Sequence, residues 1–115
     1  MTMYTEEKPW GSYTNLLDEE YTKVKKIIIK SGEAPSYQYH FKRSEIWIIV
    51  KGEAEVKIDD VVMQHKVGDV IRIPVEASHQ VRNIGEDELV FVEVQLGDYF
   101  GEDDIVRLED KYGRV

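Results

Sequence analysis

Residues 32–52 read GEAPSYQYHFKRSEIWIIVKG, and residues 68–83 read GDVIRIPVEASHQVRN. In the first stretch, five residues separate Gly32 from a Gln-x-His pair, four more lead to Glu45, and six more lead to Gly52. In the second stretch, five residues separate Gly68 from a proline, and a histidine and an asparagine follow it. Fifteen residues lie between the two stretches. Polar side chains are therefore set at fixed distances from glycine and proline turns, twice in one chain.

Short runs of β-branched and alternating residues fill most of the chain between these turns. The clearest run is Ile27-Ile28-Ile29, which is closed by Ser31-Gly32. The Asp59-Asp60 pair predicts a tight hairpin turn. Strands are expected over residues 21–30, 46–50, 54–58, 61–63, 70–73, 80–84 and 89–94. Strands this short and this evenly spaced predict an all-β fold, an antiparallel sandwich or barrel.

The 115 residues are expected to form a single domain, residues 1–115, with three parts. Residues 8–20 are interpreted as an N-terminal edge strand or lid, and residues 21–96 as the barrel core. Residues 97–115 are interpreted as a charged tail, a loop with one short helix that packs back on the barrel. Its apolar and aromatic residues favour that packing, namely Tyr99, Phe100, Ile105, Leu108 and Tyr112.

The composition of the chain argues against several classes of function. The formal net charge of −8 argues against nucleic acid, whose phosphates require basic patches. The absence of cysteine rules out disulfides and thiolate metal sites. No apolar run approaches the roughly 20 residues that span a bilayer, and the N-terminus lacks the pattern of a signal peptide. We therefore expect a cytoplasmic protein that contacts neither nucleic acid nor membrane.

Strand periodicity brings four polar side chains together. Gln38 and His40 are two residues apart and leave the same face of one strand, Glu45 lies on the next strand, and His79 on a later one. If these faces point into the barrel, an amide oxygen, a carboxylate and two imidazoles converge. Such a mixed nitrogen and oxygen set suits zinc, manganese, iron, cobalt or nickel, and affinity order alone does not choose among them.

Other interpretations of these residues stay open. Gln38 could lie beside the ligands as a supporting amide, and Glu45 could form an ion pair with Lys42 or Arg43 at a strand end. His65 lies near a hairpin end between Gln64 and Lys66 and is interpreted as an ordinary surface histidine.

The two spaced stretches resemble the paired motifs of the cupin superfamily. The resemblance implies a double-stranded β-helix, also called a jelly-roll barrel, with a metal in its interior. Two positions depart from the usual pattern: Gln38 stands where the first histidine is common, and Glu76 stands where a glycine is common.

A narrower resemblance covers almost the whole chain. Residues 8–13, KPWGSY, residues 38–47, QYHFKRSEIW, and the tail from Glu93 to Arg114 resemble the C-terminal cupin domain of type II mannose-6-phosphate isomerases. That domain is usually fused to a mannose-1-phosphate guanylyltransferase, whereas this chain resembles the cupin as a stand-alone domain. It carries no glycine-rich nucleotide loop, so nucleotidyl transfer is not expected.

The resemblance implies the interconversion of mannose 6-phosphate and fructose 6-phosphate with a divalent metal, zinc first. It implies Gln38, His40, Glu45 and His79 as ligands. A base must move a carbon-bound proton, and we expect Glu93, with Lys42 as the alternative. Cationic groups must hold the phosphate, and we expect Arg43, Arg107 and Lys25 to do so, with Trp47 as a cavity wall.

Two other classes of function remain open. Phe41, Lys42 and Ile46 replace histidines of the family pattern, which favours a non-catalytic cupin that binds a sugar or sugar phosphate. An oxygen-using iron cupin is the third hypothesis, and Gln38 counts against it. A second apolar strand face, formed by Ile46, Ile48 and Val50, predicts a homodimer.

Overall fold

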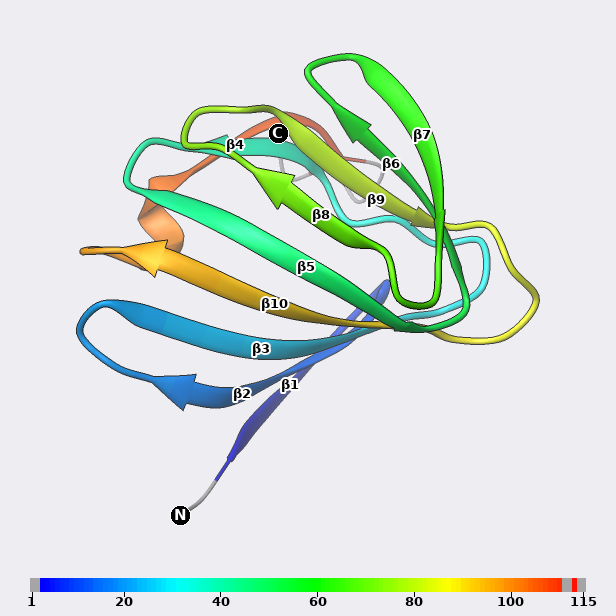
Figure 1. The fold of residues 1–115 in the computed structure, drawn as a ribbon, viewed down its shortest axis with the longest axis horizontal. Helices are drawn as coiled ribbons and strands as arrows, with labels where there is room; N and C mark the ends of the chain where they lie inside the picture. The colour runs from blue at the N-terminus through cyan, green and yellow to red at the C-terminus, as the bar shows by residue number, and fades with distance from the viewer. Residues whose placement is uncertain (1–2, 111–112, 114–115) are drawn as a thin grey trace.

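The computed structural model describes residues 3–110 and 113 as a barrel of two antiparallel sheets (Figure 1). The six-stranded sheet has the order β1-β2-β3-β10-β5-β8, and its strands are β1 (Tyr4–Lys8), β2 (Gly11–Asp18), β3 (Thr22–Ile29), β10 (Leu89–Gly97), β5 (Arg43–Lys51) and β8 (Val70–Ile73). The five-stranded sheet has the order β11-β4-β9-β6-β7, and its strands are β11 (Ile105–Glu109), β4 (Tyr37–His40), β9 (His79–Asn83), β6 (Glu53–Ile58) and β7 (Val61–Lys66). The prediction of an all-β antiparallel barrel is confirmed.

Alternation along the strands divides the interior into an apolar half and a polar half. On β5, Ile49 and Trp47 point inward and are followed on the same face by Glu45 and Arg43, and all four side chains are buried. The same change from apolar to polar occurs along β10. The Trp47 and Phe91 rings pack 5.0 Å apart between centroids, at the boundary between the two halves. The sequence therefore builds a hydrophobic core at one end and leaves a buried polar site at the other.

Two turns show why the spaced glycines matter. Gly52 has a φ of 90°, and an added Cβ would lie 2.8 Å from the carbonyl oxygen of Glu88, so only glycine fits there. Glu76 adopts a φ of 68° in the turn before β9, the position at which the cupin pattern has glycine. The turn forms nonetheless, because the Glu76 amide donates to the His40 carbonyl at 2.8 Å.

The N-terminal segment differs from the single edge strand that the sequence predicts over residues 8–20. It forms a hairpin in which Lys8 pairs with Gly11, so β1 lies at the sheet edge and β2 lies inside the sheet. The chain turns at Pro9 and Trp10, and the Trp10 side chain is buried in the core. Residues 4–7 read YTEE and lack an apolar face, which is why their pattern did not indicate a strand.

The tail contains more strand than the sequence predicts. The expected short helix is a single 3-10 turn, η1 (Glu102–Asp104), and β11 follows it. β11 pairs with β4 and places Ile105 opposite His40. Tyr112, which the sequence also assigned to the packing of the tail, lies outside the described residues. Among the residues that are described, no helix has the length and apolar character to cross a membrane.

Candidate metal centre

Three buried side chains meet at the polar end of the barrel. His40 ends β4, Glu45 lies on β5, and His79 begins β9. Their exposed fractions are only 2%, 2% and 3%. His40 Nε2 lies 3.2 Å from Glu45 Oε2, and His79 Nε2 lies 3.9 Å from Glu45 Oε1. One ligand atom from each of the three lies within 4.8 Å of the others.

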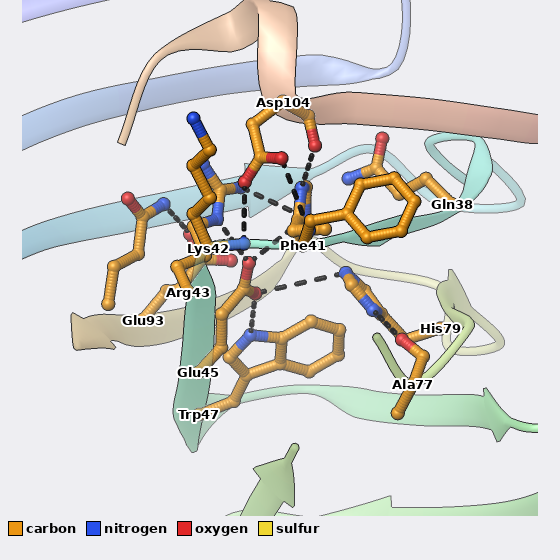
Figure 2. Close-up of polar contacts among 12 residues, drawn as sticks. Gln38, Phe41, Lys42, Arg43, Glu45, Trp47, Ala77, His79, Glu93 and Asp104 are labelled. Atoms are coloured by element: carbon orange, nitrogen blue, oxygen red, sulfur yellow. Dashed lines mark hydrogen bonds and ion pairs between the residues drawn. The ribbon is translucent and has the colours of Figure 1, made fainter. Parts of the chain in front are cut away.

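Backbone carbonyls orient both imidazoles toward Glu45. His40 Nδ1 lies 3.3 Å from the Asp104 carbonyl, and His79 Nδ1 lies 3.0 Å from the Ala77 carbonyl. A carbonyl only accepts, so each Nδ1 carries a proton and each Nε2 faces the cluster, where it presents a lone pair when the ring is neutral. Figure 2 shows the His79 ring facing Glu45 with its other nitrogen on Ala77. Metal-ligating histidines are ordinarily held in this way.

Electrostatics favour the metal-binding forms of two of the three residues, Glu45 and His79. Burial lowers the pKa of His79, which favours the neutral imidazole. Burial acts to raise the pKa of Glu45, but the Arg43 guanidinium, whose Nε donates to Glu45 Oε2 at 2.9 Å, helps to hold it well below its usual range. The Trp47 indole also donates to Glu45 Oε1 at 2.9 Å. The cluster thus offers the Glu45 carboxylate and the neutral imidazole of His79, with His40 Nε2 beside them.

This donor set fits a small divalent ion. Metal–ligand distances of about 2.0–2.2 Å place neighbouring ligand atoms roughly 3–3.5 Å apart. The separation of 3.2 Å between His40 and Glu45 lies in this range, and that of 3.9 Å between His79 and Glu45 is somewhat longer. His79 Nε2 is buried and has no hydrogen-bond partner, so a lone pair is left for an ion to take.

Gln38 lies next to this cluster. It pairs with His79 across β4 and β9, and its Oε1 accepts a hydrogen bond of 2.8 Å from the Ser36 hydroxyl. A carbonyl oxygen has two lone pairs, so this bond leaves Gln38 able to act as a fourth ligand or as a supporting amide.

A cavity of about 110 Å³ opens beside the cluster, with His79 and Gln38 in its wall. Trp47 and Phe91 form part of its apolar floor. Its described lining contains one acidic residue, Glu93, and four cationic ones, Lys8, Lys25, Arg43 and Arg107. Two of these cations are ion-paired, Lys8 with Glu6 at 3.0 Å and Arg43 with Glu45 at 2.9 Å.

The structure brings most of the expected substrate and catalytic residues to this cavity. Lys25, Arg43, Arg107 and Trp47 all line it. Glu93 is buried there and accepts a hydrogen bond of 2.6 Å from Gln95. Burial, reinforced by the charge of Glu45, raises the pKa of Glu93 to about 8.

Lys42, the alternative base, does not line the cavity. Residues 41 and 42 form a bend after β4, which breaks the strand period that would have aligned Lys42 with His40. The Lys42 ammonium instead lies 4.8 Å from the centroid of the Tyr99 ring.

Asp104 is a site residue that sequence reasoning missed. Its carboxylate accepts hydrogen bonds from the backbone amides of Phe41 at 3.2 Å and Lys42 at 3.0 Å, while its own carbonyl orients His40 (Figure 2). In the sequence it is one of three consecutive acidic residues and reads as part of a solvated loop. No local signal distinguishes it, because its partners lie more than 60 positions away.

Comparisons with known proteins identify the family of the chain. Residues 2–110 match the family described as "Mannose-6-phosphate isomerase C-terminal". The chain is 43% identical over 108 residues to the xanthan biosynthesis protein XanB of Xanthomonas campestris, covering 94% of this chain and 23% of XanB. It is 43% identical over 108 residues to the mannose-1-phosphate guanylyltransferase ManC of Salmonella typhimurium, covering 94% of this chain and 22% of ManC. The chain thus spans less than a quarter of the length of these relatives.

Solved structures show the same fold at lower identity. The capsular polysaccharide assembling protein CapF of Staphylococcus aureus superposes with a TM-score of 0.78 at 22% identity, over 94% of this chain and 34% of CapF. An oxalate decarboxylase of Lactobacillus farciminis superposes with a TM-score of 0.79 at 23% identity, over 92% of this chain and 33% of that one. These similarities establish the cupin fold and nothing about substrate. Sequence, fold and site together show that the chain belongs to the mannose-6-phosphate isomerase C-terminal family of cupins.

Proposed function

We propose that this chain is a metal-dependent isomerase that interconverts mannose 6-phosphate and fructose 6-phosphate. The observation that carries the proposal is the buried His40–Glu45–His79 cluster beside a cavity with four cations and one buried carboxyl group. Family membership and the biosynthetic roles named for its relatives support a sugar phosphate as the ligand.

His40, Glu45 and His79 would hold the ion, with Gln38 as the candidate fourth ligand. Zinc is the first candidate, followed by manganese, cobalt, nickel and iron. When bound, such an ion supplies Lewis-acid polarisation of the sugar oxygens.

The chain's own residues account for binding and proton movement. Arg43, Arg107 and Lys25 would hold the phosphate, and the apolar floor at Trp47 would pack against the sugar carbons. Glu93 would take the proton from C2 of the aldose and return it to C1, while the proton of the C2 hydroxyl passes to the C1 oxygen. Its raised pKa gives it a proton affinity close to neutral pH, which suits a group that both accepts and donates a proton.

The test follows mannose 6-phosphate by NMR with protein stripped of metal and reloaded with zinc, manganese, cobalt or nickel. We expect fructose 6-phosphate to appear only with a reloaded ion. His79→Ala protein, shown by circular dichroism to be folded, should lose bound metal and turnover together. Turnover in stripped protein, or unchanged metal content in His79→Ala, would contradict the proposal.

A non-catalytic binding role is the second candidate, and one observation favours it. Phe41, which replaces a family histidine, is 51% exposed at the bend beside the site, and Lys42 next to it points to Tyr99 rather than to the cavity. Positions 41 and 42 therefore supply no imidazole to the site. Stoichiometric binding of mannose 6-phosphate by calorimetry, without turnover for any ion, would select this candidate.

A further inference from the structure

Arg43 lies at the junction between the metal cluster and the cavity. Its side chain is buried, and its Nε donates to Glu45 Oε2 at 2.9 Å. Its Nη2 lies 3.1 Å from His40 Nε2. Arg43 thus contacts two of the three residues that would hold an ion, while also lining the cavity.

The contact with His40 uses one particular lone pair. Arg43 Nη2 lies 3.1 Å from His40 Nε2 and can only donate, so this contact requires the single lone pair that an unprotonated Nε2 has in the ring plane, with the proton on Nδ1 toward the Asp104 carbonyl. A guanidinium group has only donors, so Arg43 Nη2 donates to that lone pair. A metal ligated by His40 Nε2 would need the same electrons.

We propose that Arg43 and the metal ion compete for His40, so that the ion binds only when the guanidinium leaves His40. The inference rests on the metal centre proposed above. Seated between His40 and Glu45, the guanidinium supplies the positive charge that a buried carboxylate requires. A divalent ion supplies the same charge once Arg43 moves. Arg43 is therefore a positioning residue that sets the metal affinity of the site.

The cavity offers a second position for the Arg43 guanidinium. Arg43 Nη1 is buried without a hydrogen-bond partner, and Arg43 already lines the cavity. An anion bound there would accept from Arg43, so an anion and a metal ion would each favour the same displacement. We therefore expect inorganic phosphate to tighten Zn²⁺ binding in the wild-type protein and to leave it unchanged in an Arg43 variant.

The main test measures the Zn²⁺ affinity of metal-stripped protein by calorimetry. Arg43→Leu removes the competing donor, and we expect it to bind Zn²⁺ at least about tenfold more tightly than wild type. Arg107→Leu is the matched control, because it removes the same charge from the same cavity without touching His40 or Glu45. We expect a change below about threefold for the control. Equal affinities for wild type and Arg43→Leu, or an equal gain in both variants, would overturn the inference.

A fourth protein separates this inference from the metal centre itself. His79→Ala should abolish Zn²⁺ binding in calorimetry. If it binds as wild type does, the ion is held elsewhere and the proposed metal centre fails with the inference. If His79→Ala loses binding while Arg43→Leu gains nothing, the metal centre stands and only the competition is wrong.

A measurement on the wild-type protein covers the case in which Arg43→Leu does not fold. The Nε–H of Arg43 is hydrogen-bonded and buried, so its NMR signal should exchange slowly with water. One equivalent of Zn²⁺ should shift this signal and speed its exchange, with the Arg107 Nε–H as internal reference. An unchanged Arg43 signal, while the histidine signals report bound Zn²⁺, would overturn the competition.

Discussion

At the scale of single residues, Glu93 couples the stability of the fold to pH. Its pKa is raised from the ordinary 4.5 to about 8, chiefly by burial, so the folded protein holds a proton that the unfolded chain releases above pH 4.5. The stabilisation is complete below pH 4.5 and is lost as pH rises toward 8, by up to about 1.4 kcal/mol per pH unit. We expect Glu93→Gln, which mimics the protonated carboxyl group, to remove this decline. Chemical denaturation in EDTA from pH 5 to 8.5 measures it.

The matched control is Glu86→Gln, which removes an exposed carboxylate from the turn before β10. This variant should keep the pH dependence of the wild-type protein. Parallel stability curves for wild type and Glu93→Gln across the window would show that Glu93 ionises normally in the folded state. Glu93 would then no longer be suited to transfer the proton in the proposed isomerisation.

At the scale of elements, the turn between β8 and β9 contains a strained backbone conformation at Glu76 that a glycine would relieve. Glu76 has a φ of 68°, a left-handed conformation that costs a residue with a Cβ about 1–2 kcal/mol. Its side chain is exposed, and its amide bond to His40 belongs to the backbone. We therefore expect Glu76→Gly to raise the free energy of unfolding by roughly 0.5–1 kcal/mol, after the entropy cost of glycine. Urea denaturation measures the change. Glu76→Ala keeps the Cβ and should give no gain, and an equal gain in both variants would assign the effect to the lost charge.

The elements that sequence could predict are those with a local signal. Turns at Gly32, Gly52 and Gly68 are visible from their spacing, and the Asp59-Asp60 turn connects β6 to β7 as expected. β1 and β11 were not predicted, because each is a five-residue edge strand that is defined by backbone pairing with another strand. β1 has no apolar face, and the apolar residues of β11 were assigned to a packed loop. The cluster residues His40, Glu45 and His79 followed from strand period and turn spacing. The ion pair of Glu45 with Arg43 was one of the alternatives that the sequence left open, because the two residues are two apart on one strand, and the structure contains it. The contact of Arg43 with His40 and the hydrogen bonds of Asp104 to the bend after β4 depend on how separate segments meet, and no sequence pattern indicated them.

At the scale of the whole molecule, the outward face of the six-stranded sheet carries an apolar strip across three neighbouring strands. Val92, Ile48 and Val70 lie side by side on β10, β5 and β8. Ile48 is 38% exposed and Val70 is 52% exposed. A second copy of the chain could cover this face through a two-fold symmetric contact, so the homodimer stays our prediction. Ile48→Lys would place a charge in the centre of that contact and should give a monomer in light scattering after gel filtration.

Val62→Lys is the control for this experiment. Val62 lies on β7 of the other sheet and is 53% exposed, so the substitution adds the same charge at a comparably exposed apolar position outside the expected contact. We expect Val62→Lys to remain dimeric with the wild-type dissociation constant. Ile48→Lys should dissociate into monomers. It should keep its Zn²⁺ affinity, because the metal cluster lies on the inner side of the barrel. A monomeric wild-type protein at about 100 μM, a concentration at which a standard-sized interface is ordinarily occupied, would contradict the dimer. If only Val62→Lys dissociated, the dimer interface would instead lie on the hairpin of β6 and β7.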